Sequence, residues 1–513
     1  MSDVFDVLIV GAGLSGIGMA CHLKRRAPWA RYAILEARAD MGGTWDLFRY
    51  PGVRSDSDMF TLGYAFRPWA ESKSIADGPS ILSYIKQTAE ENDVERQIRF
   101  ATKVLTASWD SKTSQWSVEA ERGGETVRYA CRFLMMCAGY YSYAKGHVPD
   151  FVGLDSFAGR VVHPQFWPDN LDFAGKRLLV IGSGATAVTI VPEMAKTAAS
   201  VTMLQRSPTY MVARPSEDAL ANALRAKLPP RLAYALTRLR NVALNMYFYR
   251  LARKHPEAAK QRLIEMARGE LGEEVDLADF TPRYAPWDQR LCLVPDADFF
   301  QAVRDKRARV VTDEIVAFTS AGVQTKSGRT LEADIVVIAT GLQLNLLGDV
   351  AFDVDGERVD FAERRVYKGC MYEGAPNLAS VFGYTNSSWT LKADLIAGYV
   401  CRLMNFMRKR GFAAAIPPSA AGEPALPFMN LTSGYVQRAL DKLPKQGAKA
   451  PWRVYQNYAR DVEMLRFGRI DDGVLRFARA GASAQIERDS ARHLALLGGS
   501  EQALEAPPRR RPN

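Results

Sequence analysis

Phe5-Asp-Val-Leu-Ile-Val-Gly11-Ala-Gly13-Leu-Ser15-Gly16 joins a short apolar run to a glycine-rich turn. Helical character follows over residues 17–26, and residues 32–35 are apolar again, so the region predicts a strand, a turn, a helix and a second strand. In such a unit the first glycine makes the turn, the second lets a pyrophosphate approach the backbone, and the third lets helix and strand pack closely. The stretch therefore predicts a dinucleotide-binding βαβ unit.

The ribose-reading residue of this first unit is Glu36, which ends the second predicted strand 20 residues after Gly16. A carboxylate at this point accepts hydrogen bonds from both ribose hydroxyls and repels a 2′-phosphate. The first site is thus expected to bind FAD or NAD rather than NADP.

A second unit of the same kind begins at Arg177. Residues 178–181 are the predicted strand, 187–195 the helix and 201–204 the next strand, and the turn between them reads Gly182-Ser183-Gly184-Ala185-Thr186-Ala187. Arg206 stands where an acid would read the ribose, and its guanidinium can bind a 2′-phosphate with help from the Ser207 hydroxyl. This pattern assigns NADPH to the second site; a surface arginine without a ligand is the alternative.

The two units place the chain in the α/β class, with two Rossmann-like dinucleotide-binding domains and a helical insertion in the second. Residues 216–279 have helical character, with prolines at 229, 230 and 256 as breaks. The expected division is an FAD domain over 1–145 and 331–500, an NADP domain over 146–215 and 281–330, the insertion over 216–280, and a disordered tail over 501–513.

Composition limits the partners and the compartment. No run approaches the roughly 20 apolar residues that a membrane span needs, so a cytoplasmic protein is expected. Between residues 216 and 270 there are 11 Lys or Arg against 5 Asp or Glu, within a formal net charge of +10. No nucleic-acid motif accompanies this excess. A solvated basic face explains it, and a weak peripheral membrane contact stays open.

The positions of the cysteines limit which acceptor can take the electrons of the reduced flavin. Two dinucleotide sites imply that a nicotinamide reduces a flavin, and one acceptor for the flavin's electrons is a disulfide. Disulfide reductases carry a redox-active cysteine pair after a Gly-Gly-Thr, but here Gly42-Gly43-Thr44 is followed by Trp45. The six cysteines form no CxxC pair and no metal-ligand spacing, so no metal is expected. Oxygen or a quinone-like partner remains as acceptor.

Two longer patterns carry a family resemblance. Phe157-Ala-Gly159-Arg-Val-Val-His163-Pro-Gln-Phe-Trp167-Pro168 resembles the FxGxxxHxxxWP signature of type I Baeyer–Villiger monooxygenases. Gly42-Gly43-Thr44-Trp45, Tyr50-Pro51-Gly52 and Asp56 resemble a second signature of that family, GGxWxxxxYPGxxxD. The likeness covers roughly residues 5–400, including Asp334–Gly341, which looks like the return to the FAD domain. It is closest to the ethionamide-activating subgroup.

The resemblance implies a reaction. NADPH reduces FAD, oxygen adds to the flavin C4a carbon, and the resulting peroxyflavin converts ketones to esters or lactones and S-oxygenates sulfides or thioamides. Two alternatives stay open at this point. One is an N-hydroxylating flavin monooxygenase, against which the Trp167-Pro168 ending argues. The other is an NADPH oxidase or reductase that serves a redox partner.

The same resemblance implies site residues. Arg290 aligns with the catalytic arginine and Asp56 with the acid that positions it, while Gln289 replaces a common lysine contact to NADP. His163 is interpreted as a hinge between domains, and Asn386 and Trp389 as lining the substrate side. The implied FAD contacts are Gly11, Gly13, Ser15, Gly16, Glu36, Thr44, Trp45, Asp46, Leu47, Asp56 and Val104. The implied NADP contacts are Arg54, Ser55, Ser183, Gly184, Ala185, Thr186, Ala187, Arg206 and Ser207.

Overall fold

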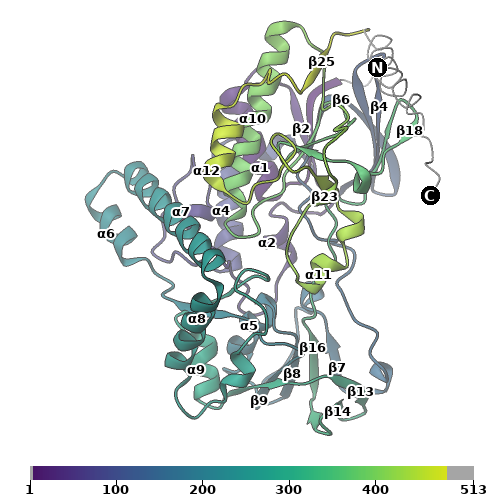
Figure 1. The fold of residues 1–513 in the computed structure, drawn as a ribbon. Coiled ribbons are helices and arrows are strands. Elements are labelled where there is room, and N and C mark those ends of the chain that lie inside the picture. Colours follow the sequence, from purple (N-terminus) through teal and green to yellow (C-terminus); the bar gives the residue numbers. More distant parts are fainter. Residues whose placement is uncertain (1–3, 482–513) are drawn as a thin grey trace, which may run out of the picture.

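The N-terminal apolar run forms strand β1 near the middle of an 11-stranded sheet in the computed structural model, which describes residues 4–481 (Figure 1). β1 pairs in parallel with β2 and β6, as expected for short strands that are apolar on both faces. The main order is β18-β17-β4-β5-β6-β1-β2-β3, and β21, β20 and β19 branch from β6. The strands are β1 (Val4–Val10), β2 (Tyr32–Leu35), β3 (Ile98–Arg99), β4 (Thr102–Asp110), β5 (Gln115–Arg122), β6 (Glu125–Met136), β17 (Ala351–Val354), β18 (Glu357–Arg358), β19 (Val366–Tyr367), β20 (Met371–Tyr372) and β21 (Leu378–Ser380).

Helices α1 and α10 cover one face of this sheet, and their buried residues join one hydrophobic core with α4. The opposite face packs a second core built from β4, β5 and the C-terminal segments. The helices of this lobe are α1 (Leu14–Arg26), α2 (Thr44–Leu47), α3 (Met59–Leu62), α4 (Gly78–Glu91), α10 (Trp389–Arg410), α11 (Gly434–Gln437) and α12 (Tyr458–Asp461). Its small C-terminal strands are β22 (Ala414–Ile416), β23 (Leu426–Pro427), β24 (Lys445–Gln446) and β25 (Arg476–Ala478).

The second βαβ unit forms a separate five-stranded sheet of parallel strands in the order β12-β9-β8-β16-β7. Helices α5, α8 and α9 contribute to the core on one face, and a small antiparallel sheet packs on the other. The elements are β7 (Arg160–Val162), β8 (Arg177–Ile181), α5 (Ala185–Met194), β9 (Ser200–Gln205), β10 (Met211–Arg214), β11 (Cys292–Pro295), α9 (Asp298–Arg304), β12 (Ala308–Thr312), β13 (Ile315–Thr319), β14 (Gly322–Thr325), β15 (Thr330–Glu332) and β16 (Ile335–Ile338).

The domain boundary expected at residue 331 is corrected by this sheet. β16 lies between β8 and β7 in the second lobe, because its apolar run is buried on both faces there. The chain rejoins the first sheet only at β17, which pairs with β4. Asp334–Gly341 is therefore the last strand of the second lobe and the start of the return. The expected tail over 501–513 lies outside the described residues.

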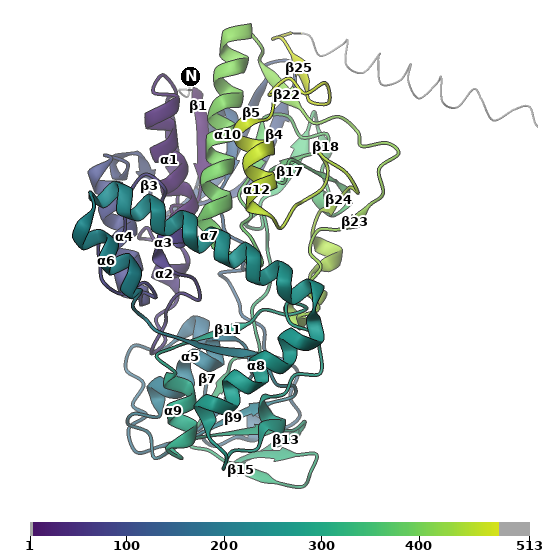
Figure 2. The same cartoon turned by 60° about the vertical axis from the view of Figure 1, so that its left-hand side comes forward.

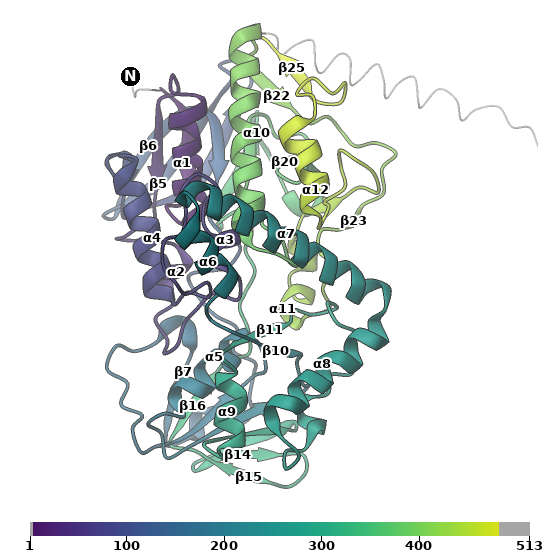
Figure 3. The same cartoon turned by 90° about the vertical axis from the view of Figure 1, so that its left-hand side faces the viewer.

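The expected insertion consists of α6 (Ala219–Lys227), α7 (Pro230–Lys254) and α8 (Pro256–Leu271). Both α7 and α8 begin at a proline, which suits the first helical turn, where no N–H bond is lost. α7 crosses the molecule beneath α1, α10 and α12, and α8 runs back to the second lobe (Figures 2 and 3). Within residues 4–481, we find no helix with the length and apolar character that a membrane crossing requires.

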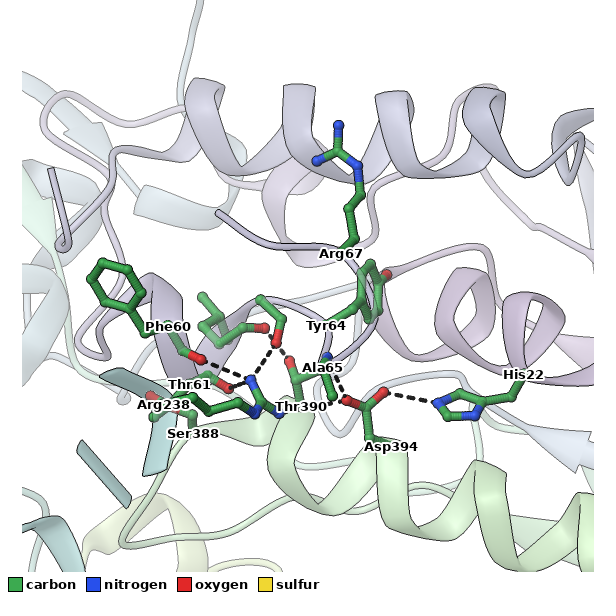
Figure 4. A network of polar contacts seen from close by, with 12 residues as sticks. His22, Phe60, Thr61, Tyr64, Ala65, Arg67, Arg238, Ser388, Thr390 and Asp394 are labelled. Carbon is green, nitrogen blue, oxygen red and sulfur yellow. Dashed lines mark hydrogen bonds and ion pairs between the residues drawn. The ribbon is translucent and has the colours of Figure 1, made fainter. Parts of the chain in front are cut away.

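A buried arginine on α7 fastens the insertion to the first lobe (Figure 4). Arg238 Nη1 donates to the carbonyl oxygens of Phe60 and Gly63, each at 2.8 Å. Its Nη2 lies 3.5 Å from Asp394 on α10, which also accepts from His22 on α1 at 3.0 Å. The Arg238 and Asp394 side chains are only 10% and 11% exposed, so each charge depends on the other for compensation.

We expect Arg238→Met to destabilise the chain strongly, because it leaves the carbonyl oxygens and Asp394 buried without the cation. Removing one partner of a buried pair costs about 3–5 kcal/mol in free energy of unfolding. Urea denaturation followed by tryptophan fluorescence measures the loss. Arg250→Met on the same helix is the control, since Arg250 is exposed and has no ion-pair partner among the described residues. Equal losses in the two variants would contradict the anchoring role.

Candidate functional site between the two sheets

A cavity of about 1280 Å³ lies between the two lobes, where β1 and β8 end. Val10 and Ile181, the last residues of these strands, both line it, together with the glycine-rich turns that follow. Ligands of open parallel sheets bind at the carboxyl ends of the strands, because the helix N-termini point there. One cavity thus receives both predicted dinucleotide sites.

The first turn is shaped to admit a phosphate group. Gly11 has φ +104°, and a Cβ built on it would lie 2.5 Å from the Cys137 carbonyl oxygen. A Cβ on Gly16 would lie 1.9 Å from the Gly11 oxygen, so the third glycine serves helix packing behind the turn rather than the cavity wall. α1 begins after Gly13 with no side-chain cap, which leaves its first N–H groups without a side-chain acceptor. These features fit a dinucleotide pyrophosphate.

Glu36 both lines the cavity and holds the turn. Its Oε2 accepts from the Ala12 N–H at 2.6 Å, and its Oε1 accepts from the Arg38 N–H at 2.9 Å. Burial raises the pKa of Glu36, and these two backbone hydrogen bonds act in the opposite direction. Each carboxylate oxygen retains a second lone pair, which suits the two ribose hydroxyls expected from the sequence.

The residues expected along the flavin separate into two groups. Thr44 and Trp45 line the cavity, but Asp46 and Leu47 do not. Asp46 is buried and accepts two hydrogen bonds from the Arg38 guanidinium, at 2.5 and 2.9 Å. Leu47 packs against the core of the second lobe. The structure therefore gives these last two residues supporting roles, because α2 turns them away from the cavity.

Ser15 and Val104, two of the predicted FAD contacts, line the cavity. Val104 lies at a register shift between β4 and β5, which interrupts the backbone pairing beside it. Ser15 Oγ accepts from the Trp389 indole N–H at 2.8 Å. This bond ties Trp389, which also lines the cavity, to the first turn. Asn386 is absent from the cavity lining and donates to the Gln456 carbonyl oxygen at 3.0 Å.

The second turn repeats the geometry of the first. A Cβ on Gly182, at φ +136°, would lie 2.3 Å from the Ala339 carbonyl oxygen. A Cβ on Gly184 would meet no atom within 4 Å, so the backbone there is open to a ligand. α5 begins after Gly184, also without a side-chain cap. Ser183, Ala185 and Thr186 line the cavity with Gly184, while Ala187 is fully buried in the core. Ala187 thus takes the packing role of Gly16.

Two arginines face the cavity beyond this turn. Arg206 and Ser207, the predicted contacts of the 2′-phosphate, line it, and Arg438, which follows α11, lines it too. Neither arginine has a carboxylate partner within the described part of the chain. The Arg438 guanidinium lies beside Gly341, because its Nη2 would be 3.7 Å from a Cβ built there. Burial and the nearby positive charge of Arg206 lower the pKa of Arg438. Two unpaired cations at one wall favour an anionic group between them.

The sequence does not indicate a role for Arg438, because this residue belongs to no recognisable motif and lies over 200 residues from Arg206. Thr432, Ser433, Gly434 and Tyr435 line the cavity with it, so the C-terminal region contributes a wall of the site. The only signal is the pair of hydroxyl residues before Gly434, which is too common to indicate a function.

Arg290 and Asp56 meet inside the cavity, as the resemblance implies. Arg290 Nη1 lies 3.7 Å from Asp56 Oδ2, and its Nε lies 3.4 Å from the Thr385 carbonyl oxygen. Burial alone would lower the pKa of Arg290, but the carboxylate of Asp56 raises it well above its ordinary value. The guanidinium therefore stays protonated. Its side chain is 36% exposed, and Arg290 lines the cavity.

Arg54 and Ser55 line the same cavity from the first lobe. The Arg54 guanidinium is bound by both oxygens of Asp298 at the start of α9, and so it ties the two lobes together. Ser55 is buried, its N–H donates to the Ala76 carbonyl oxygen at 3.0 Å, and its hydroxyl oxygen accepts from the Ser57 N–H at 2.9 Å. These contacts position the loop that carries Asp56.

His163 lies outside the cavity lining. Its Nδ1 accepts from the Gln165 N–H at 3.2 Å, and burial lowers its pKa. A Cβ on Gly146 would lie 2.0 Å from the His163 ring, so the imidazole packs directly on the segment that connects the lobes. This position supports the hinge interpretation.

The chain matches two families, described as flavin-binding monooxygenase-like over residues 71–250 and as NAD(P)-binding Rossmann-like domain over residues 9–72. It is 49% identical to FAD-containing monooxygenase EthA of Mycolicibacterium smegmatis over 94% of this chain and 99% of the relative. It is 50% identical to the putative FAD-containing monooxygenase MymA of Mycobacterium tuberculosis over 94% of this chain and 99% of that relative.

A probable FAD-binding monooxygenase, AlmA of Acinetobacter baylyi, is 47% identical over 93% of this chain and 97% of the relative. Among solved structures, an oxidized steroid monooxygenase bound to NADP superposes with a TM-score of 0.73 at 23% identity, covering 93% of this chain and 100% of that one. Cyclohexanone monooxygenase gives 0.65 at 22% identity, covering 82% and 88%. At these identities the two structures establish the fold.

We expect Arg206→Ala to weaken binding of NADP⁺ by about tenfold or more and to leave NAD⁺ nearly unchanged, because a charge-assisted hydrogen bond contributes about 1.5–3 kcal/mol. Titration calorimetry on the FAD-loaded protein measures both dissociation constants. Arg438→Ala should shift the ratio in the same direction, since this side chain faces the same wall. An equal loss of affinity for NADP⁺ and NAD⁺ would contradict the assignment of the 2′-phosphate to Arg206 and Arg438.

The cysteines give a second test. All six are buried and free, and burial raises the pKa of Cys292 in the cavity wall to about 12. At pH 8 the thiolate fraction of such a group is about 10⁻⁴. Ellman's reagent should therefore react very slowly with the native protein and promptly with six thiols after denaturation in guanidinium. Rapid reaction of two thiols in the native protein would instead support a redox-active cysteine pair as the acceptor of the flavin's electrons.

Proposed function

The chain belongs to the family of FAD-containing monooxygenases, and on that basis we propose that it oxygenates ketones and sulfur compounds in the cavity between its two sheets. FAD occupies the first turn and NADPH the second. The observation that carries this proposal is Arg290, a charged guanidinium held by Asp56 inside the cavity that both turns share.

The residues present fit both groups. The first turn has an uncapped helix start, a close backbone approach at Gly11 and the carboxylate of Glu36, which suit FAD. The second has the uncapped start of α5 with Arg206 and Arg438, which suit NADPH. When bound, the reduced flavin supplies oxygen activation, and the nicotinamide supplies the two electrons.

Arg290 provides fixed positive charge at the point where the substrate gains negative charge. Its permanent protonation means that it stabilises an anionic oxygen without exchanging a proton. Asp56 and the Thr385 carbonyl oxygen restrict the orientation of the guanidinium, so little reorganisation is needed during the reaction. Arg290 is therefore assigned as the catalytic cation and Asp56 as a positioning residue.

Aromatic side chains form the wall beside Arg290. Tyr140 stacks on Trp389 with ring centroids 4.9 Å apart, and its hydroxyl accepts a hydrogen bond from Tyr141. Tyr435 approaches from the C-terminal segment. These rings exclude water and favour an uncharged, partly apolar substrate. Ketones, sulfides and thioamides meet that description.

We expect Arg290→Ala to retain flavin reduction by NADPH within a few-fold while product formation falls by about 100-fold or more, the size typical of losing one preorganised stabiliser of developing negative charge. Stopped-flow absorbance under anaerobic conditions measures reduction. Product per NADPH consumed is measured with phenylacetone, a cyclic ketone and a thioether. Arg290→Lys keeps the charge and should recover part of the yield. Full product formation by Arg290→Ala would refute the catalytic role.

A further inference from the structure

Helix α7 is apolar on two sides: it buries Ala233, Tyr234 and Val242 against the first lobe and also exposes leucines to solvent, where an ordinary surface helix is polar. Its inward face contains Thr237 and Arg238, whose guanidinium is bound by backbone carbonyls and Asp394 (Figure 4). Its outward face presents Leu232, Leu236 and Leu239, which are 47%, 43% and 68% exposed. These leucines lie three or four positions apart and so form one stripe along the helix.

The stripe is part of a larger apolar surface. Nine of the fifteen large exposed hydrophobic side chains in the described protein lie between residues 220 and 266. On the C-terminal half of α7 the exposed members are Leu244, Tyr247, Phe248 and Leu251. Scattered exposed leucines need no explanation, but such a concentration on one helix marks an interaction surface.

The charge of α7 indicates what covers this surface. Its 25 residues include six Arg or Lys and no Asp or Glu. Arg231, Arg250 and Lys254 are exposed, and no carboxylate pairs with them within residues 4–481. Arg250 and Lys254 continue the line of Leu232 and Leu236 at helical spacing. A second copy of the chain would bring like charges together, whereas an anionic lipid surface complements both the charge and the apolar stripe.

A second cavity beside α7 adds a place for a lipid headgroup. Its volume is about 560 Å³, and its lining includes Arg25, Arg231, Leu239 and Arg466. Leu239 belongs to both the cavity and the exposed stripe, so this cationic cavity adjoins the apolar surface. An arginine cluster next to exposed leucines suits a phosphate held at the boundary between water and acyl chains.

From these observations we propose that the outward face of α7 docks on an anionic phospholipid bilayer, with its leucine stripe in the interfacial layer and its basic residues on the lipid phosphates. The contact is peripheral, and α7 lies across the side of the molecule that faces the viewer in Figure 3.

Docking at α7 would place the bilayer next to the catalytic wall. Asn245 Nδ2 donates to Ser387 Oγ at 3.1 Å, and Ser387 lines the main cavity. The Tyr249 ring contacts Trp287, three residues before Arg290, with centroids 5.3 Å apart. These contacts join α7 to the wall that carries Arg290, so a bilayer docked on its outward face would lie near the site of oxygenation, a consequence that rests on the proposed function.

The test is flotation of the FAD-loaded full chain with vesicles of phosphatidylcholine alone or with about 30 mol% phosphatidylglycerol, where an anionic surface potential attracts basic residues. We expect binding to the anionic vesicles only, weakened at about 0.5 M salt. Leu236→Glu/Leu239→Glu should weaken it by about tenfold or more, because two charges enter the interfacial layer. Val152→Glu/Val316→Glu adds the same charge at residues 71% and 54% exposed elsewhere and should bind as the unaltered chain does.

Flavin content and NADPH oxidation without lipid verify that each variant is folded. Two results would overturn the proposal: no preference for anionic vesicles, or equal binding by the two double variants. Light scattering adds a third, since dissociation of a solution oligomer by Leu236→Glu/Leu239→Glu would assign the face to a subunit interface. Vesicle binding needs no catalysis, so a failure here is distinct from a failure of the oxygenation assay.

Discussion

A single steric constraint, the approach of a glycine to the carbonyl of a neighbouring strand, organises both lobes. Gly11 lies against the Cys137 carbonyl and Gly182 against the Ala339 carbonyl, and a Cβ at either position would overlap that oxygen. Because the chain turns this tightly, each helix starts directly at the carboxyl end of its sheet. Both uncapped helix starts consequently face the same space, and the two cofactors are expected to meet there.

The chemistry of the cavity depends on segments that converge from distant parts of the chain. Asp56 comes from the loop before α3, Arg290 from the segment before β11, and the aromatic wall from the end of β6, the start of α10 and the α11 region. Arg54 bound to Asp298 holds one lobe against the other at this point. The shared cavity places Arg290, the proposed catalytic cation, between the two lobes, where a change in their relative position would alter its contacts.

The insertion shows how a buried charge can control a surface. Burying Arg238 is costly unless its donors are satisfied, and the carbonyls near α3 together with Asp394 satisfy them. Once this side chain is fixed inward, the leucines on the opposite side of α7 are fixed outward. Arg238, together with the buried Tyr234 and Val242 beside it, therefore fixes which face of α7 points outward.

The sequence by itself determined the two βαβ units and the likeness to the Baeyer–Villiger type, and it predicted which residues bind the two riboses, because glycine turns and strand ends are local patterns that a few neighbouring residues enforce. Tertiary structure decided which side chains share a wall. It turned Asp46 toward Arg38, joined Trp389 to Ser15, and placed Arg438 at the wall of Arg206. It also placed β16 in the second sheet, between β8 and β7. The apolar sequence of β16 alone is compatible with either core, so only its pairing partners determine which sheet it joins. These outcomes depend on contacts between residues far apart in the chain, and no local spacing encodes them.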